Sequence, residues 1–493
     1  MRRHALPLSS RTANLLPAET RFLFARTGVL VLSLFIGDAS AATARQASSE
    51  AATTTLNQLF ETALQSEPNY RAAQDTLTAA QARERQAFGA LLPQISATGN
   101  NNSNRRSYYQ RDSNGTTLRD GYGSDGYQFS ITQQLWRPAN ISSLNQAEKA
   151  AEQTLFQLAD SEQQLYIKLA SAWFDLMEAH DAAEFSAAQR DALKAQWDIA
   201  RRAQELGVQG QPQVDDARAK YEQASADTMG AELDISAKAA ALEQWTGMHE
   251  DVVQPVLRDD AFIPDMLGTD LQTWLAQLDA RSPALQAAQS ALAAADLEID
   301  KQRAGHQPTV DLVATYGNTA QDVGNFPGQP GYAIRQFTVG VQASLPIYSG
   351  GSQSAKVSEA LAMRDKALDD QESTRRQAIL NIKSAYYGWR AGNAKAVAAR
   401  SAITAARQAM SVATAGSGRG LKVEADVLSA RQQLVGARRD MRKGRYQQLN
   451  AYIKLKGTLG ALSLVDIRGL DELFVPQTPD TMLSALTPEH LSR

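Results

Sequence analysis

The 493-residue chain contains no cysteine, and this absence excludes several functions at once. Without thiols the protein has no disulfide framework, no thiolate metal site, no thiol nucleophile and no cysteine for a lipid anchor. Histidine is scarce too, with five residues scattered at no ligand-like spacing: His4, His180, His249, His306 and His490. We therefore expect neither a metal site nor any other cofactor.

A strong charge of one sign is also missing. The formal net charge is −3 at pH 7, and basic residues are mixed with acidic ones along the chain, so we expect no nucleic-acid partner. No Ser-His-Asp arrangement and no paired acidic cluster stands out. We therefore expect the protein not to be an enzyme, with an exported hydrolase as the minor alternative.

Long apolar runs are almost absent. The run Gly28–Ile36 follows Arg21 and Arg26 and precedes small residues, which is the pattern of an export signal. The expected cleavage box is Ala39-Ser-Ala41, with Ala42-Thr-Ala44 as the second choice. This run is too short to cross a bilayer as a helix, and no other stretch approaches 18 uninterrupted apolar residues. If the mature protein lies in a membrane, it must do so as a barrel.

What the chain does contain is an internal repeat. The first half is expected to form a helix, a strand, a polar loop, a strand, a long helix and a helix, at 56–90, 91–98, 101–126, 127–136, 139–206 and 214–246. The second half is expected to repeat this order at 270–305, 307–316, 317–335, 337–348, 352–415 and 423–461. Such regularity indicates duplication.

Landmarks of the two halves match at a nearly constant offset. Pro93 and Pro308 are 215 positions apart, and a Gly-x6-Val-x-x-Ala-Arg segment begins at both Gly207 and Gly420. We expect a signal peptide, a first repeat, a linker, a second repeat and a flexible polar C-terminal tail, at 1–41, 42–246, 247–269, 270–468 and 469–493, respectively.

The expected strands alternate between apolar and polar residues. In 127–135 the apolar positions are Tyr127, Phe129, Ile131 and Leu135, and a similar alternation begins at Phe337. This period of two indicates a sheet with one apolar and one wet face. Strands of about 9–11 residues are long enough to cross a bilayer at a tilt. A small sheet packed on helices is the commoner meaning of such alternation, and the strands alone leave it open.

The helices favour the membrane interpretation. Residues 139–206 contain neither Gly nor Pro, and a 68-residue helix is about 100 Å long. The two shorter helices beside it add up to a similar length. Seams such as Leu158-Leu165-Ala172 have coiled-coil spacing. A helix of this length does not fit into a compact globular domain, whereas it can form part of a wall with water on both sides.

Counting strands then predicts the assembly. Four strands cannot close a barrel, and a free sheet edge is not tolerated in lipid. Two copies would give eight strands with a filled interior, and three copies would give twelve strands with room for a lumen. We expect an α+β membrane protein: a trimeric twelve-stranded β-barrel continuous with a long α-helical coiled-coil tunnel. The polar loops would lie outside the cell and the helices in the periplasm.

The chain resembles the TolC family of outer-membrane factors over residues 56–464. The resemblance is carried by Leu91-Leu-Pro-Gln94, by Leu345-Pro-Ile-Tyr-Ser-Gly-Gly351 and by the paired segments at Gly207 and Gly420. It implies a homotrimer in the outer membrane of a Gram-negative cell that exports proteins or small molecules such as drugs. The implied partners are a periplasmic adaptor (membrane fusion protein), an inner-membrane ABC, RND or MFS transporter, and outer-membrane lipid.

The resemblance also implies a gate at the periplasmic tip, where each helix pair turns. The turns fall on residues from Gly207 to Pro212 and from Gly416 to Gly420. A Gly-rich segment such as the second could suggest a phosphate loop, but it lacks the GK[ST] ending and follows no strand.

Departures from the family pattern concern the gate itself. Of two acidic ring positions, the first falls on Asp426 and the second on Ser429, with Glu424 as a nearby carboxylate. A basic tethering position falls on Lys422, and a tyrosine position falls on Ser417. These differences predict that the closed gate is held together less tightly than in the family, and that cations block the tunnel less strongly. An acid near the start of a helix is also favoured by the helix dipole alone.

The main alternative class is a periplasmic coiled-coil adaptor or scaffold. Adaptors carry long helical hairpins, but usually one per chain, and they lack four alternating strands arranged as two hairpins.

Overall fold

A computed structural model of the chain describes residues 55–109, 117–247, 255–258, 270–324, 330–418 and 424–476. All of these residues lie in one compact unit, Ala51–Arg493. The expected signal peptide, 1–41, lies outside the described residues, as do most of the expected linker 247–269 and most of the expected tail 469–493.

Helices make up most of the described chain. The first half contains α1 (Leu56–Ser66), α2 (Pro68–Gly89), α3 (Pro138–Glu205) and α4 (Gln211–Thr246). The second half contains α5 (Leu271–Ala276), α6 (Leu278–Arg281), α7 (Pro283–Ala304), α8 (Ser352–Gly418), α9 (Glu424–Thr458) and α10 (Leu464–Asp471). The long helices α3 and α8 have 68 and 67 residues, which confirms the two rods expected from the sequence.

The helices expected at 56–90 and 270–305 are interrupted. Pro68 and Pro283 each lie in the first turn of a new helix, α2 and α7. Proline lacks the N–H that an interior helical position donates, but the first turn tolerates it. The two breaks are 215 positions apart, so they fall at equivalent places in the repeat.

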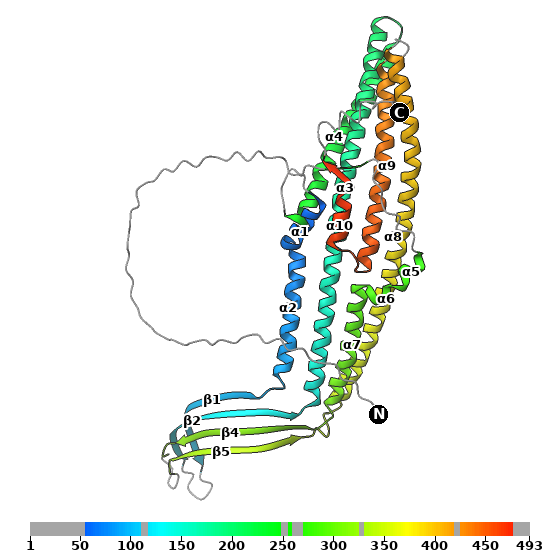
Figure 1. Cartoon of the computed structure of the whole chain (residues 1–493). Coiled ribbons are helices and arrows are strands. Elements are labelled where there is room, and N and C mark those ends of the chain that lie inside the picture. Colours follow the sequence, from blue (N-terminus) through cyan, green and yellow to red (C-terminus); the bar gives the residue numbers. More distant parts are fainter. Residues whose placement is uncertain are drawn as a thin grey trace, which may run out of the picture. The chain divides into compact units, whose positions relative to one another are not determined.

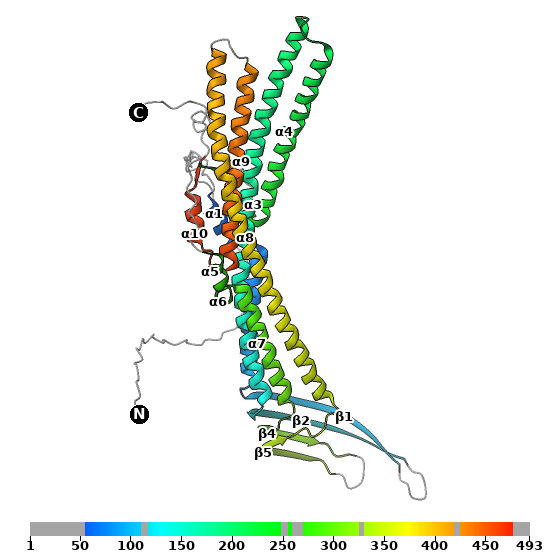
Figure 2. The same cartoon turned by 90° about the vertical axis from the view of Figure 1, so that its right-hand side faces the viewer.

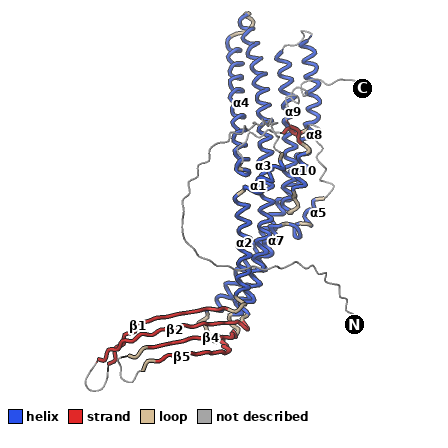
Figure 3. Tube along the Cα trace, turned by 60° about the vertical axis from the view of Figure 1, so that its left-hand side comes forward, coloured by secondary structure: helices blue, strands red, loops and turns tan. Residues whose placement is uncertain are grey.

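The four long strands form one antiparallel sheet in the order β1-β2-β4-β5 (Figure 1). They are β1 (Gln94–Tyr109), β2 (Thr117–Trp136), β4 (Thr309–Gln321) and β5 (Tyr332–Ser344). The outer edges of the sheet are therefore β1 and β5. Figure 3 shows the strands together at one end of the helices.

The strands are longer than expected, because parts of both predicted loops are strand. Residues 101–109 pair with 117–125, and 317–321 pair with 332–336. The loop prediction was wrong for these residues. They are rich in Asn, Ser, Gly and Arg, so they show no apolar alternation, but backbone pairing does not require apolar side chains.

Two shorter helices lie end to end along each long one (Figures 1 and 2). α2 and α4 both contact α3, and α7 and α9 both contact α8. α3 also contacts α7 and α9, so the two halves of the chain pack against each other. Away from the sheet, the pairs α3–α4 and α8–α9 form two hairpins that diverge in Figure 2.

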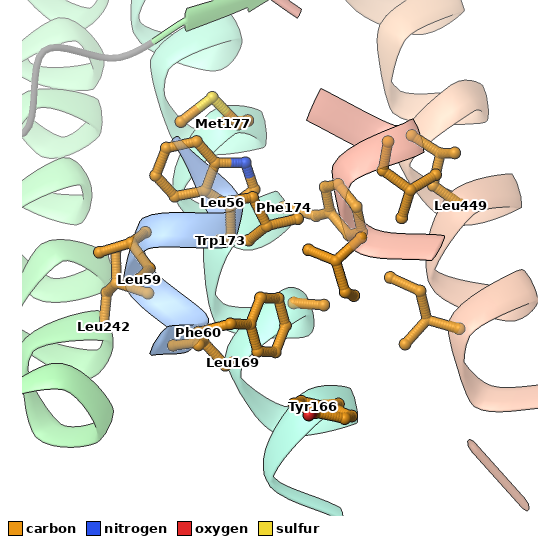
Figure 4. Close-up of a cluster of buried hydrophobic side chains, with 14 of the residues drawn as sticks. Leu56, Leu59, Phe60, Tyr166, Leu169, Trp173, Phe174, Met177, Leu242 and Leu449 are labelled. Atoms are coloured by element: carbon orange, nitrogen blue, oxygen red, sulfur yellow. The ribbon is translucent and has the colours of Figure 1, made fainter. Parts of the chain in front are cut away.

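The largest hydrophobic core lies midway along the helices (Figure 4). α1 contacts α3, α4 and α10 there. Trp173 and Phe174 of α3 are almost completely buried, and Phe60 of α1 meets Tyr166 edge to face at 5.1 Å between ring centroids. Each such buried aromatic side chain contributes roughly 2–3 kcal/mol, so this core fixes the helices relative to one another.

Residues 469–476 were expected to begin a flexible tail, and here the structure differs. They complete α10 and form β6 (Phe474–Pro476), which pairs with β3 (Pro255–Leu257). Leu470 is buried, and the ring of Phe474 stacks 6.4 Å from that of Phe174. Polar composition and prolines suggested disorder, but these two apolar side chains reach the core.

Candidate membrane-facing sheet and helical tips

Pairing across the sheet places like residues in rows. Paired positions in an antiparallel sheet point to the same face, so each row crosses all four strands. One row is aliphatic: Ile95, Ile131, Ala314 and Val339. The next is largely aromatic: Ala97, Phe129, Tyr316 and Phe337. One face of the sheet is therefore apolar.

The rows of the opposite face are polar. One consists of Ser96, Ser130, Thr315 and Thr338, and the next of Thr98, Gln128, Gly317 and Gln336. This is the division needed by a wall that separates lipid from an aqueous lumen.

The apolar face is uncovered in the single chain. Ile95 is 73% exposed and Phe337 is 70% exposed, and every residue of β5 is exposed. Soluble monomers rarely leave so large a continuous apolar surface in water. An apolar environment is therefore required on this face.

The edges of the sheet are open as well. Within the described residues, no strand pairs with the outer side of β1 or of β5. In lipid, each backbone group without a hydrogen bond costs several kcal/mol. A sheet with these edges would need a further strand on each of them if it lay in lipid.

Aromatic residues mark the limits of the apolar band. Trp136 and Tyr348 are exposed near the helical end, and Tyr127 is exposed further along β2. From Tyr127 to Trp136 the chain advances nine residues, about 23 Å of height at 3.3 Å per residue and a tilt of about 40°. That height is close to the band of about 25 Å in outer-membrane barrels.

An ion pair fixes the junction of sheet and helix. Arg137, which directly follows β2, donates hydrogen bonds of 3.2 and 2.7 Å to the two carboxylate oxygens of Asp311 on β4. Asp311 is buried. Such a two-point contact sets the direction in which α3 leaves the sheet.

Ion pairs also join the two hairpins. Arg442 of α9 donates to Asp181 of α3 at 2.5 Å and lies 3.6 Å from Glu184, while Lys443 pairs with Glu178. Burial raises the pKa of Asp181 to about 6, and the positive charge of Arg442 opposes this shift. No local sequence pattern indicates this cluster, because Asp181 and Arg442 are 261 positions apart.

The α3–α4 tip carries two exposed aliphatic side chains. The turn needs Gly207, whose φ is +73°. On either side of it, Leu206 is 80% exposed and Val208 is 76% exposed. Pro212 lies in the first turn of α4, as the expected turn requires. The sequence predicted this turn, but the two aliphatic residues that flank its glycine were not among the predicted site residues.

The predicted gate residues are only partly described. Lys422 and Gly420 lie outside the described residues, and Glu424 is the first residue of α9. Asp426 is exposed and Ser429 is half-buried, both near the start of α9. Their role in a gate therefore stays a prediction.

The second tip differs from its prediction at Gly416. α8 continues through Gly416 to Gly418, so Gly416 is helical and does not itself form the turn. Glycine is a poor helix former but is tolerated near a helix end.

In the described part of the chain, no group of three or more His, Asp or Glu side chains could hold a metal ion. None of the helices there combines the length and apolar character needed to cross a membrane.

Comparison with known proteins adds independent information. The model of the family described as outer membrane efflux protein matches residues 59–248 and 274–461. The chain is 28% identical over 380 residues to outer membrane protein TolC of Vibrio cholerae, covering 77% of this chain and 84% of that protein. It is 27% identical over 438 residues to the proteases secretion protein PrtF of Dickeya chrysanthemi, covering 87% and 93%.

The fold is shared with solved structures. The CmeC outer membrane channel of Campylobacter jejuni matches with a TM-score of 0.68 and 17% identity, over 85% of this chain and 90% of that one. The outer-membrane channel OprN also matches with a TM-score of 0.68, at 19% identity, over 83% and 90%.

Proposed function

Since the chain belongs to the outer membrane efflux protein family, we propose that three copies form one duct across the outer membrane. The protein is an outer-membrane channel for the export of proteins and small molecules. The sheet carries the trimer proposal, because it has one apolar face, one polar face and two open edges.

Closure follows from these edges. β5 of one copy pairs with β1 of the next, and three copies with four strands each close a ring of twelve. The apolar rows face lipid and the polar rows line the lumen. In the closed ring every strand is paired on both sides. An isolated sheet in lipid would instead leave the backbone groups of its two edges without hydrogen-bonding partners.

The helices continue the duct on the periplasmic side. α3, with 68 residues, has a length of about 100 Å. The ends of the strands away from the helices lie outside the cell. Along the sequence, we propose a signal peptide at 1–41 and two repeats, 42–246 and 270–468, joined by 247–269. The equivalent breaks at Pro68 and Pro283 support the two repeats.

A periplasmic adaptor and an inner-membrane ABC, RND or MFS transporter complete the pathway. The relatives include a proteases secretion protein and a probable efflux pump outer membrane protein of Pseudomonas putida, TtgC, which is 24% identical over 423 residues. We assign adaptor docking to the tip that carries Leu206 and Val208, because two exposed aliphatic side chains there need an apolar partner. The duct itself catalyses no reaction.

The aperture lies at the same end of the helices. Asp426 is exposed near the start of α9, and three copies would bring three such carboxylates into one ring. Glu424, Ser429 and Lys422 are the neighbouring gate positions. With Ser429 in place of a second carboxylate, we propose a single main acidic ring and therefore a weak block by cations.

Labelling along β5 tests the proposed wall. Single cysteines are placed by Thr338→Cys and Gln342→Cys on the polar face, and by Val339→Cys and Val341→Cys on the apolar face. The natural chain has no cysteine to interfere. A membrane-impermeant maleimide is expected to label only the first two in outer membranes, because lipid covers the others. Equal labelling of all four would contradict a transmembrane sheet and restore the periplasmic adaptor as an alternative.

A further inference from the structure

A basic hollow of about 390 Å³ lies between α3, α4 and α9. Each of these helices contributes one lysine to its lining: Lys168, Lys238 and Lys454. Asp175 of α3 is the one acidic residue among the described residues that line it. The hollow thus has more positive than negative charge, although the whole chain is slightly acidic. Its volume is in the range of small-molecule sites, about 300–1,000 Å³.

An aromatic side chain adjoins the lysines. Trp245 of α4 is half-buried, so part of its ring is accessible from the hollow. The ammonium group of Lys168 lies 5.3 Å from the centroid of this ring. Ile167, Ala172 and Ala241 add further apolar surface. The hollow therefore offers an apolar contact directly beside a positive charge.

The three lysines of the hollow form no ion pair with any described residue. Two other lysines of α9 differ in this respect, because Lys443 pairs with Glu178 and Lys456 pairs with Asp466. The ammonium groups in the hollow are therefore available to an anion from outside the chain.

The lysines of α4 and α9 act on the same carboxylate. Burial raises the pKa of Asp175, and the positive charges of Lys238 and Lys454 oppose this shift. The carboxylates of Glu178 and Asp234 act in the other direction. Two ammonium groups from different helices therefore reach one region of the hollow, where a single anionic group can contact both.

The hollow lies on the opposite side of α3 from the hydrophobic core. Lys168 and Asp175 are seven residues apart, so they share one face of the helix. Leu169, Trp173 and Met177 belong to the core and share another face (Figure 4). At about 100° per residue, these two faces point in nearly opposite directions.

The core side carries an additional layer of helices. α1 contacts α3 and α10 there, and α10, α5 and α6 lie on one side of the long helices in Figure 2. In the proposed trimer, twelve helices spaced by about 10 Å form a ring about 38 Å across between axes. A further layer inside it, with helices about 10 Å thick, would leave only about 8 Å for cargo. The additional layer therefore lies outside the ring, and the hollow faces the lumen.

We propose that this hollow binds organic anions on their way through the duct: molecules with a flat apolar part and a sulfonate, carboxylate or phosphate group. Trp245 contacts the apolar part, and the ammonium groups of Lys168, Lys238 and Lys454 bind the anionic group. The inference rests on the proposed duct and names a class of cargo for its lumen. Three copies provide three such sites at one height.

Calorimetric titration of the detergent-extracted trimer with naphthalene-2-sulfonate tests binding. The affinity is expected to fall as NaCl is raised, because salt screens the lysines. Naphthalene-2-sulfonamide, which is neutral, and methanesulfonate, which lacks the ring, are each expected to bind at least about tenfold more weakly. Equal binding of the sulfonamide would overturn the anion site, and equal binding of methanesulfonate would overturn the apolar contact.

Substitution of the three lysines tests the location. Lys168→Gln, Lys238→Gln and Lys454→Gln in one chain are expected to lower the affinity for naphthalene-2-sulfonate by about tenfold or more. The matched control carries Lys194→Gln, Lys356→Gln and Lys383→Gln, which remove the same number of charges at exposed positions that do not line the hollow. It is expected to bind like the unaltered protein. Equal affinities of the two variants would overturn the assignment to this hollow.

Current through single channels in a planar bilayer tests whether the hollow faces the lumen. Naphthalene-2-sulfonate is expected to reduce the current of the unaltered channel reversibly and to leave that of the triple-lysine variant unchanged. Binding without any effect on the current would overturn the position in the lumen.

The same experiments separate this inference from the proposed function. A conducting three-chain channel that does not bind the sulfonate would overturn the inference and leave the duct intact. Absence of a conducting three-chain particle in the unaltered protein would overturn the proposed duct itself.

Discussion

At the scale of single residues, the buried cluster of charged side chains around Asp181 has the strictest pairing requirement in the helical part. Its carboxylate is held by Arg442, whose side chain is itself 13% exposed, and Glu184 lies beside the same guanidinium. Burying an unpaired charge destabilises the folded state. Removing one partner of a buried ion pair therefore lowers the free energy of unfolding by more than the intact pair raises it. The cluster therefore fixes which side of α9 faces α3.

We predict that Arg442→Met destabilises the protein by about 3–5 kcal/mol at pH 7.5 and by much less at pH 5. The pKa of Asp181 is raised to about 6 in the folded chain. The folded chain therefore binds this proton more tightly than the unfolded chain, whose pKa is about 4. The resulting contribution to the free energy of unfolding is fully present below about pH 4 and is lost as pH rises through about 6. Without Arg442 this loss is larger, because the charged form has no partner.

Thermal unfolding at the two pH values, followed by helical circular dichroism, measures this effect. Combining Arg442→Met with Asp181→Asn is the control, and it should remove most of the added pH dependence. An equal loss of stability at pH 5 and pH 7.5 in the single variant would contradict the explanation.

At the scale of helices and strands, α8 and α9 pack unusually closely. A Cβ added at Gly392 would lie 2.8 Å from the carbonyl oxygen of Gly444 and 2.8 Å from the backbone nitrogen of Gln448. A Cβ added at Gly388, one turn earlier, would have its nearest neighbour at an ordinary 3.7 Å. The two glycines therefore have different roles in the same helix.

We predict that Gly392→Ala destabilises the protein by about 1–2 kcal/mol, because overpacking outweighs the gain of about 1 kcal/mol in helix propensity. Gly388→Ala is the matched control and should be neutral or slightly stabilising. Unfolding temperatures of the two variants measure the difference. A stabilised Gly392→Ala protein would show that the backbones do not need this close approach.

The sequence predicted the long helices well because their signals are local. Residues 139–206 lack Gly and Pro, and α3 begins and ends within one residue of that range. The strands were predicted only where apolar residues alternate. Their polar extensions at 101–109 and 117–126 depend on pairing with each other, including an ion pair of 3.4 Å between Arg106 and Asp120.

The candidate sites divide in the same way. The α3–α4 turn was predictable because Gly207 and Pro212 are strong local signals, whereas Gly416 of the second predicted turn lies within α8. The apolar and polar rows were partly predictable. Alternation along a strand predicts which residues share a face, but it does not predict which residues of neighbouring strands pair. That Ile131 pairs with both Ile95 and Ala314 is known only from the register of the sheet. The cluster of Asp181 and Arg442 joins the two halves, and no local pattern indicates it.

At the scale of the whole molecule, the two open edges of the sheet are complementary to one another. Within the part of the chain that the structure describes, β1 and β5 are the outer strands of the sheet, and neither pairs on its outer side. A rotation that brings identical copies head to tail pairs β5 of one copy with β1 of the next.

The number of copies is the central claim. Two copies would give eight strands, whose interior is filled by side chains, whereas three give twelve strands around a lumen. Export requires the lumen. The open edges of the sheet alone do not fix this number, so it must be measured directly.

The decisive measurement is the mass of the particle extracted from outer membranes in mild detergent, corrected for bound detergent. We predict a mass of three mature chains, stable to dilution. Monomers released without detergent, or a particle of two chains, would contradict the account.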